Sequence, residues 1–312
     1  MAVYTNISQS EAQVLFINVG KITQFEGIQE GVENTNYKVT LEDNKKYILT
    51  IFEKRTKEED LPFFNNAMLE FQKNGISCPT ALELDGKNVF KVKNKNCSIY
   101  SFLKGRPTKI VNKDVSISLS ELMSKMHIIG RESKLNRDNT MLMPSWSYIL
   151  RKFHNFKEHN FGEELKLVSE TIEKIQNQFP DNLNSSLIHA DLFPDNIFFE
   201  NNKISGVIDF FFTCNDTIIY DLSTLINSWF FIDKFSEENC KQFLNNYLNK
   251  INLSKNEKEN FNLYLKASAI RFFLTRLHDM YFNNSGNVNH KDPMDFFHIL
   301  RFHQKNNLED FI

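Results

Sequence analysis

The N-terminal third of the chain carries short apolar segments in which apolar and polar residues alternate. Residues 36–41 alternate in this way, residues 42–45 supply turn-forming side chains, and residues 46–52 return as a second apolar segment. Alternation with a period of two on both sides of a polar turn is typical of a β-hairpin. Segments 88–92 and 97–103 have the same character and are predicted to be two further strands.

Two helices are predicted among these strands. Ser8 and Glu11 have the spacing of a capping box, which predicts a short helix through about residue 18. Asp60 is predicted to cap a second helix that has Pro62 in its first turn and stops at an Asn-Gly pair. The apolar face of this second helix would consist of Leu61, Phe64, Met68 and Phe71.

The pattern changes after Gly105-Arg106-Pro107, where apolar residues begin to recur at helical spacing. One stripe consists of Leu119, Leu122, Met126 and Ile129. A second capping box, Ser254 with Glu257, predicts one long helix that continues to about Met280. We therefore expect an α+β chain with two domains, a small β-rich one at residues 1–104 and a large helical one at 105–312.

A polar loop interrupts the helical part and carries the most specific chemical signal. It reads His189-Ala190-Asp191-Leu192-Phe193-Pro194-Asp195-Asn196, and Asp209 follows on an apolar strand-like run eighteen residues after Asp191. Phosphoryl transfer needs one carboxylate to orient and deprotonate the acceptor hydroxyl, and it needs oxygen ligands for the Mg²⁺ bound to the nucleotide phosphates. The spacing predicts Asp191 as the catalytic base and Asn196 with Asp209 as the metal ligands. The alternative is a polar loop before a core hairpin, with Asp209 as its cap.

Two neighbours in this loop are given supporting roles. We expect His189 to be a buried hydrogen-bonding partner that fixes the loop, although direct proton transfer by it stays open. Asp195 lies beside a predicted metal ligand and is expected to face solvent or to support that ligand. A bilobal kinase architecture follows from the whole pattern, with the 1–104 lobe covering the nucleotide and the 105–312 lobe carrying the catalytic and substrate-binding residues.

The segment 27–36 contains two glycines before a predicted strand but lacks the Gly-x-Gly-x-x-Gly pattern of protein kinases. A plain β-turn explains it equally well, but given the downstream loop we expect Asn34, Thr35 and Asn36 to cover the phosphates with backbone N–H groups. Thr50 stands where kinases place the strand lysine that pairs with the phosphates. Strand alternation sends Thr50 and Lys54 to one face, so Lys54 is the candidate for the missing positive charge.

The composition limits the classes of function. The chain has 312 residues, 41% apolar content and a formal net charge of −2 without a long block of either sign, so it can bury a sizeable core and offers no basic stripe for nucleic acid. We expect no nucleic-acid partner and, because no apolar run nears the length of a membrane span, no membrane partner. The start of the chain does not have the pattern of a signal peptide.

Cysteine and histidine usage adds to this picture. The four cysteines are scattered without Cys-x-x-Cys spacing, which favours a reduced, cytoplasmic protein. The eight histidines include no His-Glu-x-x-His pair, so a zinc site has little support. We attribute the thirty phenylalanines to core filling.

The motifs resemble those of a known family. The loop around Asp191 and the segments 206–210, 220–222 and 227–229 look like the aminoglycoside-phosphotransferase-like superfamily. Further segments are similar to the bacterial homoserine kinase family within it, namely 1–5, 30–37, 48–55, 60–64 and 271–277. The resemblance covers nearly the whole chain and includes Thr at the strand-lysine position. One departure from the family pattern is the run Phe210-Phe211-Phe212.

The resemblance implies a protein-kinase-like fold and the ATP-dependent phosphorylation of the side-chain hydroxyl of L-homoserine, with Mg²⁺ as cofactor. The competing expectations are a related kinase acting on choline, an aminoglycoside or a thiosugar, and a pseudokinase that only binds nucleotide. Lys266, Arg271 and Arg276 on the predicted long helix suit a carboxylate-bearing substrate. We expect Arg271 or Arg276 to bind that carboxylate, the alternative being an ion pair within the lobe, for example to Asp221 or Asp279.

Overall fold

The computed structural model describes residues 4–29, 34–53, 56–156, 158–282 and 291–312. The chain divides into two compact units. The first unit comprises Met1–Lys104 together with Gly206–Phe211, and the second comprises Gly105–Ser205, Phe212–Asn283 and Lys291–Ile312. The segment that carries Asp209 thus belongs to the first unit, although it lies far along the chain.

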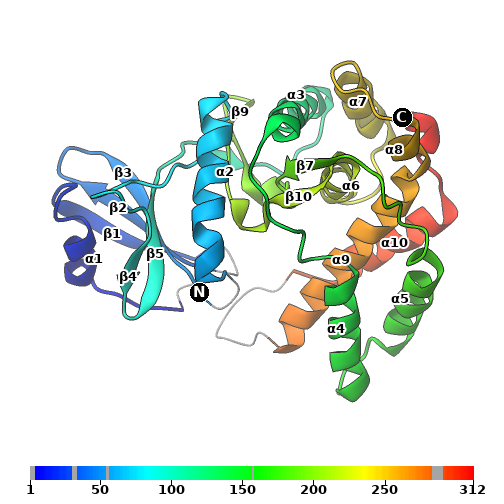
Figure 1. Cartoon of the computed structure of the whole chain (residues 1–312), viewed down its shortest axis with the longest axis horizontal. Helices are drawn as coiled ribbons and strands as arrows, with labels where there is room; N and C mark the ends of the chain where they lie inside the picture. Colours follow the sequence, from blue (N-terminus) through cyan, green and yellow to red (C-terminus); the bar gives the residue numbers. More distant parts are fainter. Residues whose placement is uncertain (1–3, 30–33, 54–55, 157, 283–290) are drawn as a thin grey trace. The chain divides into compact units, whose positions relative to one another are not determined.

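The first unit is built on a five-stranded antiparallel sheet in the order β1-β2-β3-β5-β4 (Figure 1). Its strands are β1 (Ile22–Ile28), β2 (Thr35–Leu41), β3 (Lys46–Ile51), β4 (Phe90–Val92) and β5 (Lys95–Ser101). The predicted hairpin is confirmed as β2 and β3, in which Asn36 opposes Thr50. The other two predicted strands are confirmed as β4, which is shorter than predicted, and β5, which begins and ends earlier than predicted.

A helix covers each face of this sheet. Helix α1 (Gln9–Leu15) begins at the predicted capping box and packs its buried Ala12 against the face that carries Val39 and Leu49. Helix α2 (Leu61–Lys73) contacts the other face, where Tyr100 Oη donates to Asn65 Oδ1 at 2.7 Å. Because neighbouring strand residues point to opposite faces, the side chains of the sheet are divided between these two environments.

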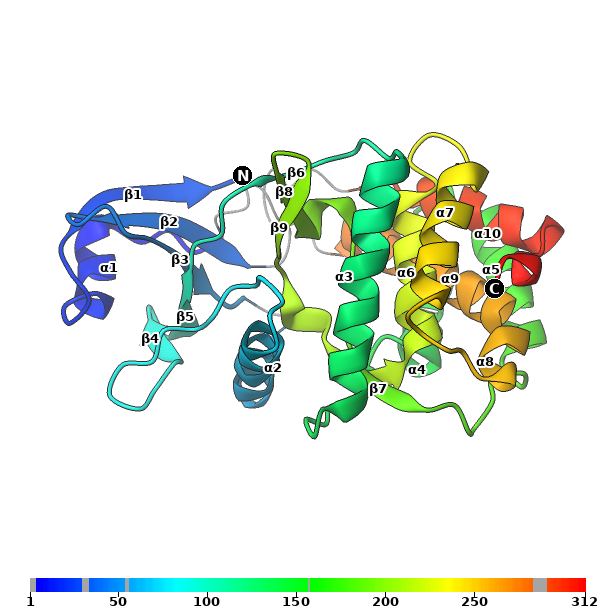
Figure 2. The same ribbon diagram turned by 90° about the horizontal axis from the view of Figure 1, so that it is seen from above.

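The second unit is mostly helical (Figures 1 and 2). Its helices are α3 (Lys113–Glu132), α4 (Met143–Asn155), α5 (Gly162–Ile175), α6 (Ile218–Trp229), α7 (Glu237–Leu248), α8 (Lys255–Glu259), α9 (Phe261–Phe282) and α10 (Met294–Lys305). Helix α9 packs against α4, α6 and α10, and α3 lies beside α7 (Figure 2). The main core of this unit gathers apolar residues of α4, α5, α9 and α10.

Short strands enter this helical unit and carry the loop singled out from the sequence. Strand β7 (Ser185–Ile188) pairs with β10 (Cys214–Thr217), and β8 (Ile197–Glu200) lies between β6 (Arg106–Pro107) and β9 (Lys203–Val207). The loop 189–196 connects β7 to β8. Its position is therefore fixed at both ends by strand pairing.

Two details of the helix prediction are wrong. Asp60 makes no side-chain capping bond, because Glu58–Asp60 form a 3-10 turn that leads directly into α2. The second capping box, Ser254 with Glu257, forms as predicted but opens only the short helix α8. The helix then breaks at Asn260, whose Nδ2 donates to Asn256 O at 2.8 Å, and α9 starts afresh at Phe261.

Among the helices of the described ranges, none is long and apolar enough to cross a membrane. All four cysteines are free and buried.

Candidate active site

Asp191 and Asn196 lie together in the loop between β7 and β8. Asn196 Nδ2 donates to Asp191 O at 2.8 Å and to Asp191 Oδ2 at 3.0 Å. A 3-10 turn, Pro194–Asn196, closes the loop and brings the amide back towards the carboxylate. Asn196 is buried, whereas Asp191 is only partly covered. The structure thus places a partly accessible carboxylate beside a fixed amide.

Ala190, which precedes Asp191, has a left-handed backbone with φ of +63°. This conformation costs an L-residue roughly 1–2 kcal/mol, so the surrounding contacts must hold it. Its N–H donates to Asp221 Oδ1 at 2.8 Å, and its carbonyl accepts from Arg271 Nη1 at 2.6 Å. Both polar groups of this residue are therefore bound to buried charges, which sets the direction in which the chain enters Asp191.

Asp221 is a fully buried carboxylate on α6 that organises this loop. Besides Ala190, it accepts from His189 N at 3.3 Å and lies 3.2 Å from His127 Nε2. Burial acts to raise the pKa of Asp221, but the hydrogen bond and charge of His127, with the charge of His189 and the Ala190 N–H, outweigh it and lower the pKa. The group is thus stable as an anion in the protein interior.

Arg271 on α9 is the matching buried cation, with a relative exposure of 1%. Its Nη1 also donates to Tyr220 Oη at 3.2 Å, and its guanidinium lies over the rings of Phe212 and Phe272 at 5.0 and 4.4 Å. Burial acts to lower the pKa of Arg271, but Tyr220 and Asp191 outweigh it and raise the pKa. Its role as a substrate ligand stays a prediction. The hydrogen bonds that it makes here are to Ala190 in the loop 189–196 and to Tyr220 on α6.

Arg276 lies one and a half turns further along α9 and is mostly covered. Its Nη1 donates to Asp292 O at 2.8 Å and to Asp295 Oδ2 at 2.9 Å, and its guanidinium lies 4.5 Å from the ring centre of Phe296. The ion pair is with Asp295, not with Asp221 or Asp279 as the sequence alternative suggested. Whether Arg276 binds substrate stays a prediction.

His189 and the end of α6 also hold the loop in place. His189 is fully buried, and its Nδ1 accepts from Asp191 N at 3.2 Å. Leu192 O accepts from Trp229 Nε1 at 3.0 Å at the end of α6. These contacts fix the backbone on both sides of Asp191 and suit a positioning role for the histidine.

Asp209 follows β9 and has a left-handed backbone with φ of +66°. After it, Phe210 and Phe211 pack within the first unit, where Phe210 contacts Phe71, and Phe211 contacts Phe52. Most of the Phe-rich departure from the family pattern thus serves as core. The packing anchors the residues directly after the carboxylate.

The two predicted metal ligands are each of a type that suits Mg²⁺. Asn196 uses Nδ2 for both of its bonds to Asp191, so Oδ1 is the atom of this amide that suits a cation. Asp209 offers a carboxylate, and no group of three or more His, Cys, Asp or Glu side chains able to hold a metal occurs in the described parts of the chain. Mg²⁺ binds through few protein oxygens and completes its shell with water and phosphate oxygens, so an amide and a carboxylate fit it.

In the first unit, the strand-lysine position holds a neutral pair. Thr50 Oγ1 donates to Asn36 Oδ1 at 2.7 Å on the sheet face that α2 contacts. Thr35 is next to Asn36 in β2 and therefore points to the opposite face. Asn36 and Thr50 thus lie together, whereas the side chain of Thr35 lies on the other face. That the backbone N–H groups of Asn34, Thr35 and Asn36 cover the phosphates stays a prediction. Lys54 lies outside the described residues.

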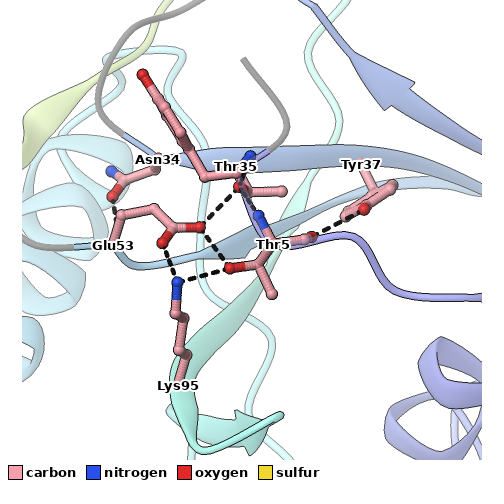
Figure 3. Close-up of polar contacts among 7 residues, drawn as sticks. Thr5, Asn34, Thr35, Tyr37, Glu53 and Lys95 are labelled. Atoms are coloured by element: carbon pink, nitrogen blue, oxygen red, sulfur yellow. Dashed lines mark hydrogen bonds and ion pairs between the residues drawn. The ribbon is translucent and has the colours of Figure 1, made fainter. Parts of the chain in front are cut away.

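On that opposite face, Glu53 joins three segments of the chain (Figure 3). Its Oε1 accepts from Thr35 Oγ1 at 2.8 Å and from Thr5 Oγ1 at 2.7 Å, and its Oε2 pairs with Lys95 Nζ. Thr35 Oγ1 in turn accepts from Thr5 N at 3.1 Å, and Asn34 Oδ1 accepts from Glu53 N at 3.3 Å. The network ties the N-terminal segment to the residues just before β2.

Sequence reasoning missed several of these supporting residues. Asp221 was considered only as a possible ion-pair partner of Arg271 or Arg276, and the contact of Arg271 with Ala190 spans 81 positions in sequence. A buried-looking Asp within an apolar helix was the available signal, because such a charge requires partners. Lys95 and Thr5 carried no comparable signal.

The profile of the phosphotransferase enzyme family matches residues 24–249. The chain belongs to this family. It is 34% identical over 316 residues to the homoserine kinase of Paramagnetospirillum magneticum, with 97% of each chain covered. It is also 34% identical over 314 residues to the homoserine kinase of Brucella canis, with 98% of this chain and 95% of the relative covered. These matches identify a phosphotransferase that acts on small molecules.

Solved structures agree on the fold. An amicoumacin kinase in complex with AMP-PNP, Ca²⁺ and Ami superposes with a TM-score of 0.72 at 16% identity, covering 96% of this chain and 93% of the other. A spectinomycin phosphotransferase in complex with ADP and spectinomycin gives 0.69 at 16% identity, with 98% of both chains covered. The predicted protein-kinase-like fold is confirmed, with a β-sheet region followed by a helical region.

Proposed function

We propose that the protein transfers the γ-phosphoryl group of ATP to the side-chain hydroxyl of L-homoserine and releases O-phospho-L-homoserine and ADP. The observation that carries the proposal is the 34% identity to homoserine kinases over almost the full length of both chains. The intact set of Asp191, Asn196 and Asp209 supports a catalytic protein over a pseudokinase. ATP as donor is supported by solved relatives bound to AMP-PNP and to ADP.

In this proposal Asp191 accepts the proton of the acceptor hydroxyl and aligns its oxygen with the γ-phosphorus. Phosphoryl transfer depends mainly on positioning and on charge stabilisation, so the rigid entry to Asp191 matters as much as its basicity. Asn196 and Asp209 would hold Mg²⁺, which neutralises negative charge on the phosphates when it is bound. Asn34, Thr35, Asn36 and Thr50 are the candidates for nucleotide contacts in the first unit, with Lys54 as the candidate cation.

The proposal is tested by ADP release from the purified protein with a panel of acceptors. The panel contains L-homoserine, L-serine, L-threonine, choline and kanamycin, each with MgATP. We expect kcat/KM for L-homoserine to exceed that for every other acceptor by about 100-fold or more. Choline and kanamycin lack the carboxylate, and the shorter side chains of L-serine and L-threonine misplace the hydroxyl. Preferred turnover of choline or kanamycin would replace homoserine by that acceptor, and ADP release with none of them would favour the pseudokinase alternative.

A further inference from the structure

Two cations converge on one aromatic ring beside the proposed catalytic base. Phe193 follows Asp191 by two positions, and its N–H donates to Asp191 O at 2.8 Å. Lys291 Nζ lies 5.1 Å from the centre of the Phe193 ring, and the guanidinium of Arg276 lies 5.9 Å from it. Arg276 from α9 and Lys291 from the segment before α10 thus bring positive charge close to Phe193 in the loop 189–196.

Each of these cations is held by a carboxylate. Lys291 Nζ lies 2.6 Å from Asp195 Oδ2, and Arg276 pairs with Asp295. Burial lowers the pKa of Arg276, and nearby carboxylates oppose that shift; they are Asp295, Asp191 and Asp195. The arginine therefore lies within electrostatic reach of the proposed catalytic base.

The two cations keep a means of binding another anion. The hydrogen bonds of Arg276 to other described residues all use Nη1, and a guanidinium fork has five N–H donors. Lys291 and its partner Asp195 are each about half exposed, with side-chain values of 46% and 50%. A lysine ammonium has three donors, so one ion pair does not exhaust it.

We propose that Arg276 and Lys291 form the subsite that binds the carboxylate of an α-amino-acid substrate, with Asp195 as the residue that positions Lys291. The inference rests on the proposed function and identifies the substrate class, a zwitterionic amino acid with a side-chain hydroxyl. A polycationic aminoglycoside or an amino alcohol has no carboxylate for these two cations to bind, so the subsite favours an amino acid over both.

The inference assigns different tasks to the two arginines of α9. Arg271 has an exposure of 1% and binds Ala190 O, so it positions the loop. Arg276 lies closer to the surface and beside a second cation that the sequence analysis did not single out. One arginine is therefore a positioning residue and the other a substrate ligand.

The test compares Lys291→Met with Lys305→Met, a matched loss of one lysine from an exposed site at the other end of α10. A charge-assisted hydrogen bond contributes about 1.5–3 kcal/mol, so Lys291→Met is expected to raise the KM for L-homoserine about tenfold or more. The KM for ATP should stay unchanged, and Lys305→Met should behave as wild type. Arg276→Lys, which keeps the charge but loses the fork, should raise the same KM by a smaller factor.

A second substrate distinguishes two roles of Lys291. In one role it binds the substrate carboxylate, and in the other it only links the segment before α10 to Asp195 in the loop 189–196. L-homoserinol replaces the carboxylate by CH₂OH and is compared by its KM, or by its Ki against L-homoserine. Lys291→Met should leave the value for L-homoserinol unchanged, because the group that it binds is absent. An equal rise for both molecules, or an unchanged KM for L-homoserine, overturns the subsite.

The failure of the subsite can be distinguished from the failure of the proposed function. If the wild type phosphorylates L-homoserine and Lys291→Met does so with the same KM, only the subsite is wrong. If the wild type phosphorylates no amino acid of the panel, both are wrong.

Discussion

Asp191 is held through its neighbours. Ala190 is bound on one side by Asp221 and on the other by Arg271, and Asn196 donates to the carboxylate itself. Buried polar groups with all partners in place rigidify a site, because any displacement leaves a charge without its partner. The residue-scale account is therefore one of a carboxylate whose position is fixed by buried charges of both signs.

The substitution Asp191→Asn removes the proposed proton acceptor and so tests its role directly. Asp191→Asn keeps the size of the side chain, so MgATP binding should remain within a few-fold of wild type. We expect kcat with L-homoserine to fall by about 10²-fold or more, since general-base catalysis contributes about 10²–10⁴-fold. Steady-state kinetics and calorimetric titration with MgATP measure the two effects. A variant that keeps activity within about tenfold of wild type would remove Asp191 from the role of base.

The assignment of Asp209 as a metal ligand predicts a loss of nucleotide affinity, whereas Asp191→Asn should leave that affinity nearly unchanged. Asp209→Ala deletes the anionic ligand, so the affinity for the nucleotide should fall in the presence of Mg²⁺ and change little when EDTA is present. Calorimetric titration with ATP under both conditions measures this difference. Equal MgATP affinity in Asp209→Ala and wild type would place the metal on other residues.

At the scale of elements, the close contact between α3 and β7 positions the start of the loop 189–196. A Cβ at Gly130 would lie 2.1 Å from Leu187 O and 2.8 Å from Ser186 Oγ. Only a glycine permits this approach, and β7 leads directly into residue 189. The packing of one helix against one strand therefore bears on the geometry of the site.

Gly130→Ala should lower the free energy of unfolding by about 1–3 kcal/mol, the usual cost of overpacking, and should also lower kcat. Denaturant unfolding and steady-state kinetics measure the two effects. Gly162→Ala is the matched control, since a Cβ there meets nothing within 4 Å; it should leave stability unchanged or raise it by about 0.4–1 kcal/mol. A Gly130→Ala protein as stable and as active as wild type would contradict the close contact.

The Glu53 network predicts a pH dependence of stability in the first unit. Burial acts to raise the pKa of Glu53, but bonds to Lys95, Thr5 and Thr35 outweigh it and lower the pKa from the ordinary value of 4.5. A carboxyl with a lowered folded pKa stabilises the protein above its unfolded pKa and loses that contribution as the pH falls through the folded value. The stabilisation should thus be complete near pH 7 and decline below about pH 4.5.

Glu53→Gln should accordingly lower the free energy of unfolding near pH 7 by about 1.5–3 kcal/mol, the range for hydrogen bonds to charged groups, and by progressively less below pH 4.5. Denaturant unfolding at pH 7 and at pH 3.5 measures both values. Asp43→Asn, which removes an exposed pair with Lys45, is the control and should have little effect, because solvent screens such pairs. A Glu53→Gln deficit that is the same at both pH values would contradict the network.

At the scale of the whole molecule, the sequence predicted those helices and strands that depend on residues close together in the chain. The hairpin of β2 and β3 and the capping box at Ser8 follow from residues a few positions apart, and both formed as expected. The predicted helix after Ser254 is interrupted at Asn260, between α8 and α9, and the apolar spacing does not reveal this interruption.

The loop motif could be recognised for the same reason, since Asp191 and Asn196 are five positions apart. The residues that hold the loop could not be predicted, because Asp221, Arg271 and Lys291 reach it from helices and segments distant in sequence. Such long-range contacts depend on how the elements pack, which apolar spacing alone does not specify. The fold class and the kinase family were thus predictable from the sequence, whereas the contacts that support the loop required the structure.

The central claim is the transfer of phosphate from ATP to the homoserine hydroxyl, and the most direct measurement identifies the product. We expect ³¹P NMR of the protein with MgATP and L-homoserine to show one new phosphate monoester, coupled to the side-chain CH₂O protons, that accumulates in a one-to-one ratio with ADP. The Asp191→Asn protein should give no such signal in the same time. Inorganic phosphate as the only new phosphorus species besides ADP, or no reaction at all, would contradict the account.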